Sequence, residues 1–185
     1  LGLNEKYRDH FFACDFTSNA GSSKIWAVAV KPKGAGFEVV KREPFVTGLV
    51  PTDCEFGPDG AFYWSDWVGG WAPQNRGRLF RATDPEAMKD PRVAEAKKLV
   101  EEGSHSQSVE NLVKRLHFPH QLVRQEAQYE LAARAPEVAI DAFAGMLKDS
   151  KDRLARLHAV WGLGQVARAQ QSRRAWVPVL AALKD

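Results

Sequence analysis

The sequence has 185 residues, enough for one or two domains. With 44% hydrophobic and 26% charged residues it has an ordinary globular composition, which excludes wholesale disorder. The net charge of +3 is small, and the arginines of the last third alternate with acidic and apolar residues, so a nucleic-acid-binding protein is not expected. No apolar run approaches the roughly 18 residues that a transmembrane segment needs. The chain begins at Leu1 without Met, and we expect a processed or truncated start.

Residues 1–84 predict short antiparallel strands. Apolar and β-branched runs cover 11–15, 25–30 and 37–40, with a turn cluster at 17–23 and a stop at Pro32. The pattern restarts with strands at 52–56, 61–65 and 78–83, and Pro58 and Gly60 predict a tight turn between the first two. A four-stranded meander repeated about every 40–45 residues is typical of β-propeller blades. This region therefore predicts an incomplete propeller of about two blades.

The remaining residues change to the period of α-helices. Residues 85–107 predict a connecting helix and linker, and 108–185 predict helices over 109–116, 122–133, 138–147, 154–167 and 175–183. The triplet Arg124, Ala127 and Leu131 recurs 32 residues later as Arg156, Ala159 and Leu163. Such helix pairs stack because no single pair can bury its own apolar stripe. The sequence as a whole thus predicts an α+β protein, propeller-like strands followed by an α-solenoid of HEAT-like helix pairs.

Three aspartates lie at predicted strand ends in similar contexts: Asp15, Asp53 and Asp66. Carboxylates at the axis of a propeller can hold a metal or a substrate hydroxyl. Ca²⁺ takes six to eight oxygen ligands, so Asp15 and Asp53 are candidate metal ligands. The alternative is that each aspartate caps a turn or accepts hydrogen bonds from the neighbouring backbone.

A Gly- and Trp-rich loop follows the strand at 61–65. Its aromatic faces suit stacking on a sugar or quinone, and nearby arginines can meet an anionic cofactor. The candidate cofactor-binding residues are Asp53, Asp66, Trp67, Trp71 and Arg78. The alternative for the tryptophans, Trp64 included, is packing inside the protein. No catalytic residue can be assigned, because no Ser/His/Asp arrangement, phosphate loop or HExxH motif is present.

Cys14 and Cys54 are the two cysteines, and both lie on predicted strands. Adjacent strands can bring them together, so they are a disulfide candidate in an oxidising compartment. The alternative is a pair of buried thiols that act as small hydrophobic residues. The absence of CxxC and CxxCH motifs excludes a thiolate zinc site and covalent haem attachment on this chain.

In the helical half, polar residues are interpreted mainly as structural. His117 and His120 flank Pro119 in a turn between helices and make a poor metal site without a third ligand. Arg124 is interpreted as a residue that bonds neighbouring turns. His158 lies beside Trp161 and is interpreted as a packed helical residue.

Ordered motifs resemble those of one protein family. The segments Val50–Gly60, Tyr63–Trp71 and Gly77–Arg81, with Arg124–Gln128 and Arg156–Gly164, resemble the large membrane-bound-dehydrogenase-like proteins of planctomycetes and verrucomicrobia. Those proteins have a sorbosone/glucose-dehydrogenase-like propeller, then HEAT repeats, and often a C-terminal cytochrome with a CxxCH motif. The resemblance runs in order from residue 11 to about residue 183, so it covers nearly the whole chain.

The resemblance implies an exported protein, periplasmic or extracellular. It implies pyrroloquinoline quinone (PQQ), Ca²⁺ and haem c in the family, but no cofactor is expected on this chain, which lacks the cytochrome and the earlier blades. From this resemblance we expect either a fragment of a longer protein or a shortened relative.

For these residues we expect a non-catalytic interaction or scaffold role. The expected partners are other protein subunits, among them a c-type cytochrome or a membrane complex. The alternative is the C-terminal part of an active PQQ-type sugar dehydrogenase whose catalytic blades lie outside this chain.

Overall fold

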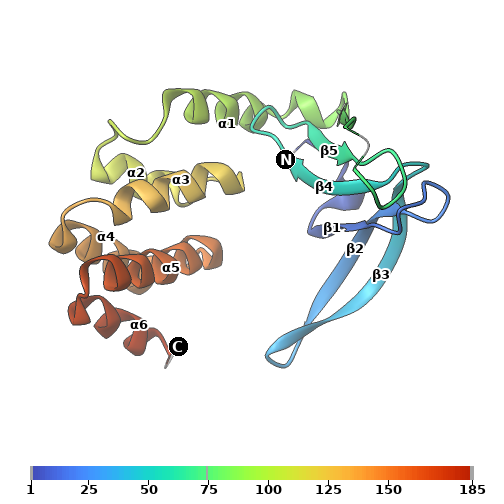
Figure 1. Cartoon of the computed structure of the whole chain (residues 1–185). Helices are drawn as coiled ribbons and strands as arrows, with labels where there is room; N and C mark the ends of the chain where they lie inside the picture. Colours follow the sequence, from blue (N-terminus) through green and yellow to red (C-terminus); the bar gives the residue numbers. More distant parts are fainter. Residues whose placement is uncertain (1, 74, 184–185) are drawn as a thin grey trace. The chain divides into compact units, whose positions relative to one another are not determined.

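The computed structural model describes residues 2–73 and 75–183 (Figure 1). Within these residues the fold is α+β, with six antiparallel strands followed by six α-helices. The chain divides into two compact units, Leu1–Ala94 and Glu95–Asp185. All the strands lie in the first unit, and the boundary falls inside the first α-helix. None of the described helices is long and apolar enough to cross a membrane.

The first sheet is antiparallel and contains, in this order, β1 (His10–Asp15), β2 (Lys24–Lys33) and β3 (Gly36–Thr47). Ile25 and Ala27 of β2 are fully buried, as expected for alternate residues of a half-buried strand. The predicted stop at Pro32 is wrong, since β2 continues past it. Because β1 pairs with β2 only as far as Ala29, Pro32 lies where β2 has a single neighbour, and a proline is tolerated there.

The third strand also extends further than its pattern indicates, to Thr47 instead of Val40. Its second half is charged and contains Pro44, which argues against a strand in a sequence considered alone. In the structure β3 is an edge strand that pairs along the whole of β2, with a register shift beside Pro44. An edge position and a bulge are the two places where a sheet accepts proline.

The second sheet is also antiparallel and contains β4 (Pro51–Phe56), β5 (Phe62–Asp66) and β6 (Arg78–Ala82). The tight turn predicted between β4 and β5 is confirmed. Gly60 has a φ of +76°, and its amide donates to the Gly57 carbonyl at 3.0 Å. Each described sheet has three strands, the number that the sequence pattern predicted in each half, whereas a propeller blade has four. The described residues of the first unit thus form two small antiparallel sheets.

An aromatic cluster forms the centre of the first unit. The buried ring of Phe62 lies 4.9 Å from Phe12, 5.3 Å from Phe45 and 5.0 Å from Phe56, measured between ring centroids. These rings come from both sheets, so the cluster joins them. Contacts between β1 and β4 complete the association of the sheets. Phe62 is buried and the other three rings are partly buried around it, and such aromatic contacts are a large stabilising contribution for so small a unit.

The predicted helices are present with small changes at their ends. They are α1 (Pro91–Glu102), α2 (Val109–Arg115), α3 (Gln121–Ala132), α4 (Pro136–Asp149), α5 (Arg153–Gln170) and α6 (Trp176–Ala182). Ser108 and Asp152 are N-caps whose side chains accept backbone amide hydrogen bonds. Pro136 occupies the first position of α4, where its missing N–H has no cost.

The core of the second unit is formed by the apolar faces of α2 to α6, with Phe143 of α4 at its centre and fully buried. The repeated residues Ala127 and Leu131 of α3 and Ala159 and Leu163 of α5 are all fully buried. The sequence repeat thus corresponds to an equivalent packing face on two helices that lie against one another.

Candidate functional site

Asp66 is the most highly connected of the predicted site residues. Its side chain is fully buried, and one carboxylate oxygen accepts hydrogen bonds from the amides of Val50 (2.8 Å) and Val68 (3.0 Å). The other oxygen forms an ion pair with Arg78 at 2.6 Å. Burial raises the pKa of Asp66, but these hydrogen bonds and the guanidinium outweigh it and hold the pKa below its usual value. Both oxygens are thus used to shape the loop that follows β5.

The loop that Asp66 holds is strained at Val68, which has a φ of +79°. That conformation is costly for a β-branched residue. The hydrogen bond that the Val68 amide donates to the Asp66 carboxylate stabilises it. Trp67 and Trp71 both lie against Phe16, with centroid distances of 6.3 and 5.3 Å. The structure therefore brings Asp66, Trp67, Trp71 and Arg78 into one region, where Trp71 remains 74% exposed.

The other two aspartates make local contacts. Asp15 accepts a hydrogen bond from the indole of Trp26 at 3.0 Å, and Asp53 accepts from the amide of Cys54 at 2.8 Å. Among the described residues no three His, Cys, Asp or Glu side chains converge as a metal site would require. The geometry of Asp15, Asp53 and Asp66 therefore does not fit a Ca²⁺ site made by all three, and the assignment of Asp15 and Asp53 as ligands stays a prediction.

The two cysteines are neighbours. Cys14 on β1 and Cys54 on β4 are both partly buried free thiols on strands that contact one another, and the Cys54 Sγ lies 3.8 Å from the Phe12 carbonyl. Burial raises the pKa of Cys14. Burial, and then the charge of a Cys14 thiolate, raise the pKa of Cys54 to about 12. Both thiols therefore stay protonated and react slowly at neutral pH.

We expect oxidised glutathione to convert this pair into a Cys14–Cys54 disulfide, releasing two molecules of reduced glutathione. The thiols are adjacent, so little backbone movement is needed. Alkylation after denaturation, followed by intact mass, should show two labelled thiols before oxidation and none after it. A Cys14→Ser variant should instead stop at a mixed disulfide on Cys54. Two fully labelled thiols after oxidation of the original chain would contradict the prediction.

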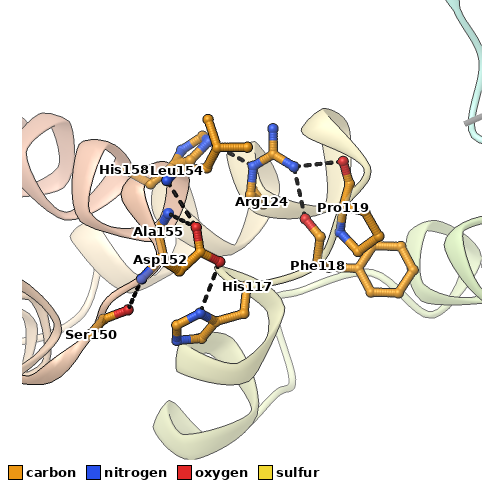
Figure 2. Close-up of polar contacts among 9 residues, drawn as sticks. All are labelled: His117, Phe118, Pro119, Arg124, Ser150, Asp152, Leu154, Ala155 and His158. Carbon is orange, nitrogen blue, oxygen red and sulfur yellow. Dashed lines mark hydrogen bonds and ion pairs between the residues drawn. The ribbon is translucent and has the colours of Figure 1, made fainter. Parts of the chain in front are cut away.

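In the second unit a buried arginine connects helix turns (Figure 2). Arg124 of α3 is 7% exposed, and its Nη1 donates to the carbonyls of Phe118 and Pro119, both at 2.7 Å. These carbonyls belong to the turn that precedes α3, where no intrahelical donor is available to them. The structural role predicted for Arg124 is confirmed. Its Nε donates to a third partner, the Nε2 of His158 on α5, at 3.2 Å.

The bond from Arg124 determines the tautomer of His158. An arginine Nε–H only donates, so His158 Nε2 accepts and Nδ1 carries the proton. Nδ1–H then donates to the Gln128 Oε1 at 2.7 Å, and the Gln128 amide donates to the Gln165 Oε1 at 2.7 Å. The result is a chain of hydrogen bonds, all in the same direction, from Arg124 through His158 and Gln128 to Gln165. Each of its three hydrogen bonds links α3 to α5.

His158 is held neutral in this chain. Burial is the main cause that lowers the pKa of His158, and repulsion by the Arg124 guanidinium lowers it further. The charge of Asp152 opposes the shift, and the resulting pKa is about 4. Its ring also meets Trp161 edge to face at 5.1 Å. The interpretation of His158 as a packed residue beside Trp161 is confirmed.

Asp152 connects the start of α5 to the turn before α3 (Figure 2). One carboxylate oxygen caps α5 through the amides of Leu154 and Ala155, and the other meets His117 at 3.1 Å. Burial raises the pKa of Asp152, but the amide and His117 hydrogen bonds outweigh it and hold the pKa below its usual value. His120 caps α3 by accepting from the Leu122 amide. Neither histidine belongs to a metal cluster among the residues described.

A pocket of about 470 Å³ opens above this framework, between α3, α5 and the start of α6. Its floor includes His158, Gln128 and Gly164, which are buried. Its walls are polar and aromatic, formed by Gln121, Gln125, Tyr129, Val160, Trp161, Gln165, Arg168 and Trp176. The rings of Tyr129, Trp161 and Trp176 are 50%, 53% and 44% exposed. Large aromatic rings half-exposed in a hollow are typical of a binding surface.

The pocket was not among the predicted sites, although the sequence contains a signal for it. Gln121, Gln125 and Gln128 recur at helical spacing along α3, and His158, Trp161, Gln165 and Arg168 do the same along α5. Each set therefore lies on a common helix face. A stripe of amides and aromatic rings is an unusual composition for either a core or a solvated face.

Comparisons with models of protein families, with curated proteins and with solved structures found no match. The resemblance to the dehydrogenase-like family therefore rests on the sequence motifs alone. For the function of the chain, the geometry of the two units is the available guide.

Proposed function

We propose that this chain is a protein-interaction module that binds an extended peptide segment of a partner in the pocket between α3, α5 and α6. The observation that carries the proposal is the lining of that pocket, in which three half-exposed aromatic rings alternate with glutamine side chains. Tryptophan and tyrosine are the residues that most often anchor protein–protein contacts, because each provides a large rigid surface and a polar tip.

The glutamines suit a peptide main chain. A primary amide offers both a donor and an acceptor, the same pair that each peptide unit presents. The Gln121 side chain makes no hydrogen bond to another described residue. The side-chain amide nitrogen of Gln125 donates to the Tyr129 hydroxyl at 2.8 Å, which leaves the side-chain oxygen of Gln125 for a ligand. These groups are spaced along α3, so they can follow an extended segment.

The framework below the pocket favours binding. The hydrogen-bond chain from Arg124 to Gln165 is buried along most of its length and holds Gln128 and Gln165 in one orientation. Side chains that are already ordered lose little entropy when a ligand arrives, so more of the contact energy contributes to affinity.

The finer architecture and lineage belong to the same proposal. We infer HEAT-like helix pairs for the second unit, from the repeat at 124–131 and 156–163, and a propeller-like origin for the strands of the first. Within this proposal the chain is a non-catalytic scaffold from an exported sugar-dehydrogenase-like protein, and the partner is another subunit of that complex. An active PQQ-type dehydrogenase with catalytic blades elsewhere is the alternative, and sugar oxidation by a longer chain would favour it.

The proposal is tested with fluorescein-labelled octapeptides of randomised sequence, followed by fluorescence anisotropy on the whole chain. We expect saturable binding that Trp161→Ala weakens by roughly tenfold or more, as for a buried aromatic anchor. The matched control is Leu157→Ala, also an exposed apolar residue of α5 but outside the pocket, which should leave affinity unchanged. Equal loss in both variants, or no saturable binding by any peptide pool, would rule out this function.

A further inference from the structure

Arg168 gives the pocket an uncompensated positive charge. Within 2–73 and 75–183 its guanidinium has no hydrogen bond or ion pair, whereas Arg115, Arg124, Arg134 and Arg174 of the second unit each have a carboxylate or carbonyl partner. One turn before it, Gly164 leaves the wall without a side chain, and Nη1 of Arg168 lies 3.5 Å from the position that a Cβ there would take. The guanidinium thus lies over an open part of the pocket floor.

No acidic residue lines the pocket, so Arg168 is its single charged group among the described residues. His158 adds no charge near neutral pH, because its pKa is lowered to about 4 by burial and by Arg124. Arg168 is exposed at the edge of this hollow, and a guanidinium with no acidic neighbour in the lining can form a charge-assisted pair with a ligand that supplies an anion. The charge of the pocket therefore favours a negatively charged ligand group.

The free hydrogen-bonding groups beside Arg168 are mainly donors. The chain that begins at Arg124 ends at Gln165, whose Oε1 is occupied and whose amide N–H groups are left for a ligand. The Tyr129 hydroxyl accepts from Gln125, so its own hydrogen is also available. Donors that converge near a guanidinium are the arrangement that recognises a carboxylate.

We propose that the peptide bound in this pocket carries an acidic side chain, whose carboxylate pairs with Arg168 and Gln165, beside an apolar side chain that packs on Trp161 and Trp176. This rests on the proposed function and specifies its ligand. A single arginine with flanking aromatic rings matches one carboxylate next to an apolar residue. A polyphosphate would need several cations, which the lining does not provide.

The experiment uses the whole chain and fluorescein-labelled octapeptide pools that differ only at one central position, fixed as Glu, Gln or Lys and followed by Phe. We expect the Glu pool to bind about tenfold more tightly than the Gln pool, as a charge-assisted contact does. Raised salt should reduce this preference, and the Lys pool should bind least. Inorganic phosphate should compete no better than chloride at equal ionic strength.

Arg168→Gln should remove the preference for Glu over Gln, measured as the ratio of the two affinities within that variant. Arg168→Lys should retain part of the preference for Glu over Gln. Arg153→Gln, at the start of α5 and outside the pocket, makes the same change in net charge and should retain all of it. If peptides bind and Trp161→Ala weakens them, but Glu, Gln and Lys pools bind equally, the acidic ligand is excluded and the peptide-binding function stands. If no pool binds, the proposed function itself fails.

Discussion

Gly162→Ala should lower the free energy of unfolding of the helical unit by about 2 kcal/mol, although alanine is the better helix former. Gly162 lies within α5, where a Cβ would meet the tip of the Phe143 ring at less than van der Waals separation. Phe143 is fully buried at the centre of the core, so its ring has no free space to enter. The overpacking therefore exceeds the gain in helix propensity. Thermal or urea unfolding followed by helical circular dichroism measures the change.

Gly145→Ala in α4 is the matched control for this substitution. A Cβ at Gly145 meets nothing within 4 Å, so the change should stabilise the unit by about 0.5–1 kcal/mol through helix propensity alone. The clash with Phe143 predicts a further result. The Phe143→Leu background removes the ring tip. In that background the loss of unfolding free energy caused by Gly162→Ala should be smaller by at least about 1 kcal/mol. Equal costs in both backgrounds would show that Phe143 is not what excludes the methyl group.

Acidification from pH 7 to pH 4 should lower the stability of the same unit by about 3 kcal/mol through His158 alone. The pKa of His158 is about 4 in the folded protein, against 6.5 for an unperturbed histidine. Between these values the unfolded chain binds a proton that the folded chain excludes. The free energy of unfolding therefore falls as the pH falls, with full stability above 6.5 and the loss complete below about 4.

His158→Gln separates this effect from other titrations. A glutamine amide offers an acceptor to Arg124 and a donor to Gln128 but does not titrate, so the variant should lose most of the dependence on pH between 4 and 6.5. The charged groups near the ring are Arg124 and Asp152, and the lowered pKa of Asp152 places its own contribution below 3.8. His105, which is almost fully exposed, is the control, and His105→Gln should keep the original slope. An unchanged slope in His158→Gln would contradict the assignment.

The local elements could be predicted because their causes are local. The alternation in β2, the cap at Ser108, the proline at the start of α4 and the turn at Gly60 all depend on residues within a few positions of one another. Where prediction of an element was wrong, at Pro32 and beyond Val40, the deciding factor was a neighbouring strand. Whether a strand has one neighbour or two cannot be read from its own residues.

For the site residues, too, prediction succeeded within one segment of the chain and failed where separate elements meet. The region around Asp66, Arg78 and the loop tryptophans was recognisable because these residues lie close together in the chain. The hydrogen-bond chain from Arg124 to Gln165 and the pocket above it were not, since their members come from α3, α5 and α6. Helical spacing placed each set of residues on a common face but could not show that the two faces meet.

By itself the sequence determined an α+β chain with strands before helices, a repeated helical face and the adjacency of residues within each element. The tertiary structure decided which faces meet. The fit of Phe143 against Gly162 brings α4 and α5 together, and the Arg124–His158–Gln128 bonds join α5 to α3. Only then does Arg168 lie beside the aromatic rings of one pocket. The physical reason is that periodicity and capping act over one or two turns, whereas these buried hydrogen bonds join residues thirty or more positions apart.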